Sequence, residues 1–137
     1  QQPGFPGAFR SNQGSGPYVI TQFESTAARL VFPCFDEPDF KTPWQLTVDV
    51  PSGLLALSNT GATTPTAIDS GHQRFAFAPT RPLASYFVAF EEGPFELVNA
   101  GTAKSGVTIR IETPRGTTKQ GALLASAQTR LVDSLEE

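Results

Sequence analysis

The stretch TQFESTAARLVFPCFDEPDFKTPW (residues 21–44) joins a strand-like run to an alternating one and holds the densest chemistry of the chain. Aromatic residues and prolines surround its cysteine, Cys34, and an acidic pair, Asp36 and Glu37, follows. Such a cluster fits a reactive site, a metal site or a turn within a larger domain.

Local patterns predict a short strand followed by helical turns at the start of this stretch. YVITQFE (18–24) begins as a strand, and STAARLV (25–31) fits one or two helical turns with Ser25 as the N-cap. Pro33 ends these turns, because a residue before proline avoids the helical region.

Further strands are predicted after residue 43 from the alternation of apolar and polar residues. The strand-like runs are 44–50, 54–59, 72–78, 85–93 and 107–113. The run 54–59 follows a Pro-Ser-Gly turn and could return as the hairpin partner of 44–50. The run 85–93 is apolar on both faces, as a central buried strand would be.

The pattern changes after Pro114. Leu124, Ala127, Leu131 and Leu135 recur at steps of three and four residues, which predicts an amphipathic helix whose stripe packs inward. The predicted fold is therefore mainly β, with a short helical turn near 25–31 and a C-terminal amphipathic helix. An α+β domain and an all-β domain followed by the first helix of the next domain both fit this order.

Length and composition favour one folded, turn-rich domain. The chain has 137 residues, with 12 prolines, 12 glycines and 11 phenylalanines. The net charge of −3 and the lack of a basic run give no reason to expect a nucleic-acid partner. No apolar run approaches the about 20 residues of a transmembrane helix, and one cysteine allows no internal disulfide.

The front of the chain, residues 1–17, is rich in Gly, Pro, Ser and Asn and is expected to be irregular. It lacks an initiator Met and the basic and apolar regions of a signal peptide, so we expect a piece of a longer protein. The compartment stays open between the cytoplasm and the cell envelope or exterior.

The titratable residues are expected to be structural. The single His72 and the single Cys34 lie far apart and cannot complete a zinc site of a common type. Between Pro33 and Phe35, the thiol of Cys34 should be buried and inert. The acidic pair could serve acid–base chemistry, but adjacent acids more often cap a turn or pair with a cation such as Arg29 or Lys41.

Gln22 and Glu24 are the candidate binding residues. They alternate with Thr21 and Phe23, so both point to one side at the end of a strand. An amide beside a carboxylate suits a cationic, hydrogen-bonding group such as an α-ammonium. Two ordinary surface side chains are the simpler interpretation.

The order of residues resembles that of the aminopeptidase N-type zinc metallopeptidases. The opening stretch matches their T-Q-x-E, A-R and F-P-C-F-D-E-P-x-F-K signature without a gap. GAFRS (7–11), FAPTRPLASYFVAFEEGPFELV (77–98) and GVTIRIETP (106–114) resemble further segments of the N-terminal β domain of that family. Ser25 and the ASY tripeptide at 84–86 depart from the usual pattern.

The resemblance implies a saddle-like β-sandwich of antiparallel or mixed sheets. Residues 1–113 would be a partial N-terminal β domain, and residues 114–137 a linker and first helix leading into the catalytic domain. Zinc, its ligands and the general base would lie outside this chain, which therefore holds no catalytic or metal residue. Gln22 would line the pocket for the first side chain of a peptide substrate, and Glu24 would hold its free α-amine.

Two other readings stay open at this point. The parent could be a non-catalytic homologue that has lost its metal ligands. The chain could also be a stand-alone β-sandwich binding module, since a fold hosts many functions.

Overall fold

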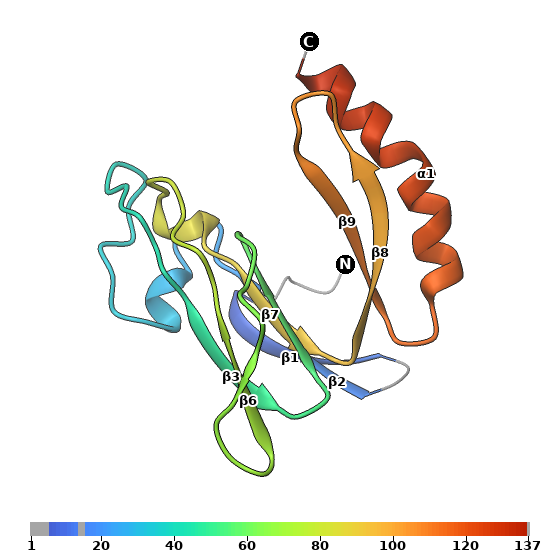
Figure 1. Cartoon of the computed structure of the whole chain (residues 1–137). Coiled ribbons are helices and arrows are strands. Elements are labelled where there is room, and N and C mark those ends of the chain that lie inside the picture. Colours follow the sequence, from blue (N-terminus) through green and yellow to red (C-terminus); the bar gives the residue numbers. More distant parts are fainter. Residues whose placement is uncertain (1–5, 14–15, 137) are drawn as a thin grey trace. The chain divides into compact units, whose positions relative to one another are not determined.

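The computed structural model describes residues 6–13 and 16–136, and most regular structure in it is β-strand (Figure 1). These residues form two compact units, one of residues 6–12 and 16–93 and one of residues 94–136 with Gln13. The predicted mainly β fold with a C-terminal helix is confirmed.

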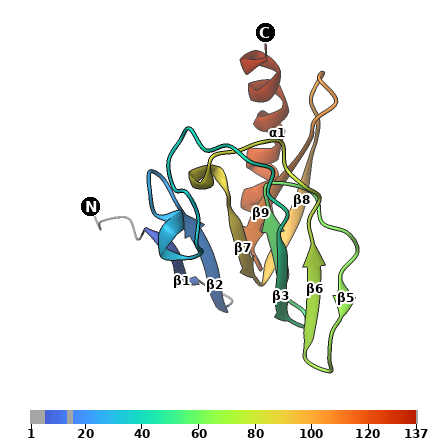
Figure 2. The same ribbon diagram turned by 90° about the vertical axis from the view of Figure 1, so that its left-hand side faces the viewer.

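The first unit contains two sheets (Figure 2). In one, the strand order is β1 (Gly7–Gln13), β2 (Gly16–Gln22), β7 (Phe90–Gly93) and β4 (Leu55–Ser58). In the other, the order is β3 (Thr47–Pro51), β6 (His72–Ala76) and β5 (Thr66–Ala67). The expectation of an irregular front was wrong for residues 7–13, because pairing with β2 outweighs their weak strand propensity.

The predicted hairpin of 44–50 with 54–59 does not form. β3 pairs with β6 in antiparallel register from Thr47↔Ala76 to Pro51↔His72. β4 instead pairs with β7, which belongs to the other sheet. This crossing puts Ala56 of β4 into one buried cluster with Val50, so both sheets contribute to a shared core.

The shared core confirms the alternation that the sequence predicted. Val50, Phe75 and Phe77 are buried, and Phe75 and Phe77 lie on one face as expected. Between residues 44 and 50, the apolar side chains are buried or half-buried, whereas the polar side chains at alternate positions are exposed.

Two short 3-10 helices stand where the sequence predicted a helical turn and part of a strand. Ala28–Leu30 forms the turn near 25–31, with Ala27 and not Ser25 at its N-cap. Ser85–Phe87 forms the other, so the predicted strand 85–93 begins only at Phe90. β7 is nevertheless the central strand that was expected, between β2 and β4.

The second unit is a hairpin covered by a helix (Figure 1). β8 (Phe95–Thr102) and β9 (Thr108–Pro114) pair in antiparallel register, and α1 (Thr118–Leu135) packs against both. Gly121 makes the close approach possible, because a Cβ atom there would lie 2.5 Å from Cγ2 of Thr113. Thr129 donates a hydrogen bond of 2.5 Å to the carbonyl of Ala100.

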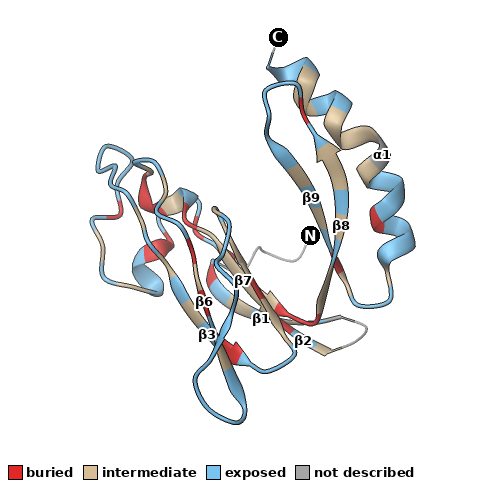
Figure 3. Ribbon diagram, in the orientation of Figure 1, coloured by how far each residue is buried: buried red, intermediate tan, exposed pale blue. Residues whose placement is uncertain are grey.

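The leucine stripe of α1 does not pack on this hairpin, contrary to the prediction (Figure 3). Leu124 and Leu131 are each 55% exposed and Leu135 is 86% exposed. Gly121 and Thr129 instead meet the strands, where the missing side chain of Gly121 allows a close approach. No helix among residues 6–13 and 16–136 has the length and apolar character needed to cross a membrane.

Candidate functional site

The end of β2 presents Gln22 and Glu24 to solvent, while Thr21 and Phe23 are buried. The hydroxyl of Thr21 donates a hydrogen bond of 2.8 Å to the carbonyl of Phe90 and accepts one of 2.9 Å from its N–H. This two-way contact attaches the strand end to β7, so the two exposed side chains project from a fixed backbone.

Phe23 provides the second attachment. It is 2% exposed, and its ring meets Phe32 edge-on at a centroid distance of 5.6 Å and Phe90 at 6.4 Å. Its carbonyl also accepts a hydrogen bond of 2.8 Å from the N–H of Ala27, which turns the chain after the strand. Glu24 therefore leaves the sheet between a buried aromatic ring and a tight turn.

Glu24 borders a shallow pocket of about 250 Å³. Ser25, Pro38 and Tyr86 complete the lining, so the pocket combines one acidic residue with an aromatic residue and a proline. Gln22 is exposed but does not line this pocket. The peptide bond between Glu24 and Ser25 is cis.

Asp36 holds the turns around this site together. Its carboxylate is buried and accepts hydrogen bonds of 3.1 Å from the backbone N–H and from Nε of Arg29, and a short one from the hydroxyl of Ser85. Burial alone would raise the pKa of Asp36, but these hydrogen bonds and the guanidinium charge outweigh it and hold the pKa below its ordinary value. The predicted pairing of an acid with Arg29 is confirmed.

Cys34 is half-buried beside this network. Burial raises the pKa of its thiol, and the nearby charge of Asp36 raises it further. A raised pKa disfavours the reactive thiolate. The expectation of a structural rather than a nucleophilic cysteine agrees with this environment.

Two aromatic residues on either side of Pro38, Phe35 and Phe40, lie at the surface. Phe35 is 80% exposed and Phe40 53% exposed, and their rings lie 5.3 Å apart. Both rings belong to the segment that also supplies Pro38 to the Glu24 pocket, and together they form an exposed apolar pair. Exposed apolar surface of this kind often marks an interaction site.

No candidate metal centre is found in the described part of the chain, where no three His, Cys, Asp or Glu side chains are grouped to hold an ion. His72 is an exposed surface residue, and its Nδ1 lies 3.1 Å from a carboxylate oxygen of Asp69. The residues present therefore do not fit a zinc ion.

A comparison with known protein families shows to which family the chain belongs. The model of the Peptidase M1 N-terminal domain matches residues 4–87, the part that contains the Glu24 pocket, the Asp36 network and every strand of the first unit except β7. The chain belongs to this family. The resemblance inferred from the signature residues is thereby confirmed.

Relatives of this M1 N-terminal domain are named aminopeptidases. The chain is 42% identical over 132 residues to the puromycin-sensitive aminopeptidase of Caenorhabditis elegans. This matched region covers 94% of the chain but only 14% of that protein. It is 34% identical to endoplasmic reticulum aminopeptidase 2 of Bos taurus (86% of the chain, 12% of that protein) and 33% identical to aminopeptidase N of Acetobacter pasteurianus (83% and 32%). The chain thus spans a third or less of each of these relatives.

Sequence reasoning named only Glu24 among the four residues of the pocket, and it missed Ser25, Pro38 and Tyr86. Pro38 and Tyr86 stand 14 and 62 positions after Glu24, a spacing that no local pattern relates to a strand end. Only the packing of the 85–87 turn beside the 21–44 segment brings Tyr86 into the same pocket as Glu24.

Proposed function

We propose that this M1 N-terminal domain is part of a zinc-dependent aminopeptidase that removes N-terminal residues from peptides. In this proposal Glu24 anchors the free α-ammonium of the substrate, and Gln22 contributes to the pocket for the first side chain. The zinc ion and its ligands belong to another part of the parent, where the metal would activate the attacking water. The proposed end of the β domain is residue 113, and residues 114–137 would lead into the catalytic domain.

The observation that carries this proposal is the presentation of Glu24. Its carboxylate is exposed at the rim of a small pocket, while its backbone is held by the buried Thr21 and Phe23. An exopeptidase must recognise one chain terminus, and a fixed carboxylate does so by charge. An internal peptide bond carries no ammonium, so it would leave the carboxylate without a partner once the site is closed.

The lining of the pocket supports an ammonium ligand in particular. Tyr86 lines the same pocket as Glu24, and an aromatic face attracts a cation. An anionic group would be repelled by the carboxylate, and a neutral group would lack the charge attraction to both neighbours. We therefore expect the discrimination between free and blocked N-termini to arise here.

The catalytic domain of the parent is the proposed partner of this face. The exposed rings of Phe35 and Phe40 lie in the segment that also supplies Pro38 to the pocket. A domain that covers these rings would also close the pocket against water, which strengthens the pairing of Glu24 with an ammonium.

Kinetics of the full-length parent test the role of Glu24. We expect Glu24→Ala to lower kcat/KM for an aminoacyl amide roughly 30- to 1000-fold, because the ammonium loses its counter-charge. This factor corresponds to a loss of about 2–4 kcal/mol of transition-state stabilisation. Glu24→Gln, which keeps the shape and removes the charge, should lose nearly as much. Glu37→Ala, a change of an exposed acid in the same segment, serves as the control.

Unchanged kinetics for both Glu24 variants would reject the anchor role.

For Gln22→Ala, we expect a changed preference among first residues with the requirement for a free amine retained. A parent sequence that lacks an intact zinc-binding motif would instead favour the non-catalytic homologue.

A further inference from the structure

The Glu24 pocket contains two hydroxyl groups besides its carboxylate. They belong to Ser25 and Tyr86, which line the pocket together with Glu24 and Pro38. Among residues 6–13 and 16–136, none of these three polar side chains has a hydrogen-bond partner. Their hydrogen-bonding capacity is therefore available to a ligand of the pocket.

The turn after β2 makes no use of the hydroxyl of Ser25. The sequence predicted this residue as an N-cap, whose hydroxyl would accept a hydrogen bond from a backbone N–H. In the structure, Ala27 is the N-cap of Ala28–Leu30, and no side chain caps that turn. Ser25 is exposed, and it is a position where the chain departs from the usual pattern of its family. Its hydroxyl thus has no local structural role.

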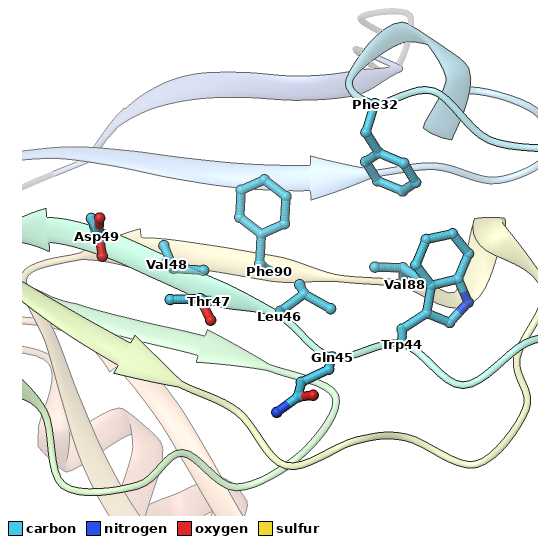
Figure 4. Close-up of a pocket in the computed structure, with 9 residues that line it drawn as sticks. All are labelled: Phe32, Trp44, Gln45, Leu46, Thr47, Val48, Asp49, Val88 and Phe90. Atoms are coloured by element: carbon cyan, nitrogen blue, oxygen red, sulfur yellow. The ribbon is translucent and has the colours of Figure 1, made fainter.

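Packing accounts for the ring of Tyr86 but not for its hydroxyl. The ring lies 4.2 Å from that of Phe87, measured between centroids, and packs against the buried cluster that contains Phe23. Phe32 and Trp44 pack against the same cluster, with ring centroids 5.4 Å apart (Figure 4). A phenylalanine would make the same ring contacts, so the hydroxyl is the group that needs another explanation.

Hydrogen bonds hold both walls of the pocket in place. Beside Tyr86, the hydroxyl of Ser85 donates a hydrogen bond to the buried carboxylate of Asp36. On the other wall, the N–H of Ala27 donates a hydrogen bond of 2.8 Å to the carbonyl of Phe23, which closes the turn that carries the pocket serine. Walls that are fixed in advance lower the cost of ordering the site around a ligand.

A primary ammonium group needs three hydrogen-bond acceptors. It has three N–H donors and no acceptor, and its tetrahedral geometry directs them to different sides. One carboxylate, that of Glu24, balances the charge but cannot accept from all three directions. Each hydroxyl oxygen has acceptor lone pairs, so Ser25 and Tyr86 can take the remaining two N–H groups. A donor left unpaired in a closed site is costly.

We propose that Ser25 and Tyr86 are specificity-determining residues, which accept two N–H groups of the substrate's α-ammonium while Glu24 accepts the third. The pocket then selects a primary N-terminal amine over an N-methylated one, although both carry the same charge. This inference rests on the proposed function, because it adds two partners for the ammonium that Glu24 anchors.

Binding of two amino alcohols to the full-length parent, measured by titration calorimetry, tests the inference. L-leucinol and N-methyl-L-leucinol contain no bond for a peptidase to hydrolyse and differ by one N–H. We expect the primary amine to bind with a roughly 10- to 100-fold lower Kd, because a hydrogen bond to a charged group is lost on methylation.

Variants of the two hydroxyl residues should reduce this preference. Ser25→Ala and Tyr86→Phe should each weaken binding of L-leucinol roughly 10-fold. Binding of N-methyl-L-leucinol should change little, because its methyl group can turn toward the vacated side. Ser25→Thr keeps a hydroxyl and should keep the preference. Pro38→Ala changes a lining residue without a polar side chain, so it should leave the ratio of the two Kd values unchanged.

The outcomes separate this inference from the proposed function. A natural parent that does not distinguish the two amines, or a ratio unchanged in both Ser25→Ala and Tyr86→Phe, would overturn the inference. Equal weakening of both ligands would also overturn it, since that result indicates a distorted pocket. An inactive parent with a preference that depends on the hydroxyls would reject the proposed function alone. An active parent in which Glu24→Gln is defective and the hydroxyl variants keep the ratio would reject this inference alone.

Discussion

At the scale of single residues, Asp36 is the centre of the signature segment, and its role is structural. One buried carboxylate accepts hydrogen bonds from Arg29 and Ser85, which are 56 positions apart in the sequence. It thereby joins the turn after β2 to the turn before β7. The cluster that suggests a reactive site in the sequence is the support behind the Glu24 pocket.

Removal of this carboxylate should destabilise the fold. We expect Asp36→Ala to lower the free energy of unfolding by about 2–3 kcal/mol, since it leaves buried donors unsatisfied. Removing one partner of a fully buried ion pair costs about 3–5 kcal/mol. We expect a smaller loss here, because the Arg29 side chain is 53% exposed. Urea unfolding of the 137-residue chain measures it, with the exposed neighbour change Glu37→Ala as a control within about 0.5 kcal/mol.

The same residue predicts a dependence on pH. Because folding lowers the pKa of Asp36, its contribution is fully present above the ordinary carboxyl value of 3.8 and is lost as the pH falls through the lower folded value. The stability difference between the natural chain and Asp36→Asn should therefore be constant near neutral pH and shrink below about pH 4. A difference that grows toward acid pH would contradict this account.

At the scale of elements, the sheet of the first unit depends on a glycine. Gly93 ends β7 opposite Leu55, and a Cβ atom there would lie within 3.0 Å of three ring atoms of Tyr18. Tyr18 is 2% exposed, so its ring cannot move aside without disturbing the core. The glycine is thus required by a close approach between strands.

Gly93→Ala should therefore lower the free energy of unfolding by at least about 1–3 kcal/mol, the usual cost of overpacking. Gly61→Ala is the matched control, because no atom lies within 4 Å of its added Cβ and its backbone is not left-handed. Urea unfolding of both variants measures the difference. Equal stability of the two would show that the sheet can adjust around Tyr18.

At the scale of the whole chain, catalysis is not expected of these residues alone. We expect the 137-residue chain to show no turnover of an aminoacyl chromogenic amide with added zinc, because its described residues include no group of three metal-binding side chains. The intact parent under the same conditions is the positive control. Zinc-dependent turnover by the isolated chain would overturn the assignment of the metal site to another part of the parent.

Much of the fold could be predicted from sequence because its signals are local. Alternation along 44–50 and 72–78 reports which face of a strand is buried, and the order of residues in 21–44 identified the family. The alternation of Gln22 and Glu24 with buried neighbours was also predictable from strand geometry. Arg29, the partner of Asp36, was one of the two nearby cations that the sequence offered, with Lys41 as the other.

The tertiary structure decided what depends on contacts between distant residues. It paired β4 with β7 rather than β3, turned the leucines of α1 away from the hairpin, and brought Tyr86 to Glu24. Propensity and periodicity show that a residue is buried or exposed, but strand pairing and helix packing depend on which surfaces fit together. The physical reason is that backbone hydrogen bonding and close packing are properties of two surfaces, whereas a sequence pattern describes only one.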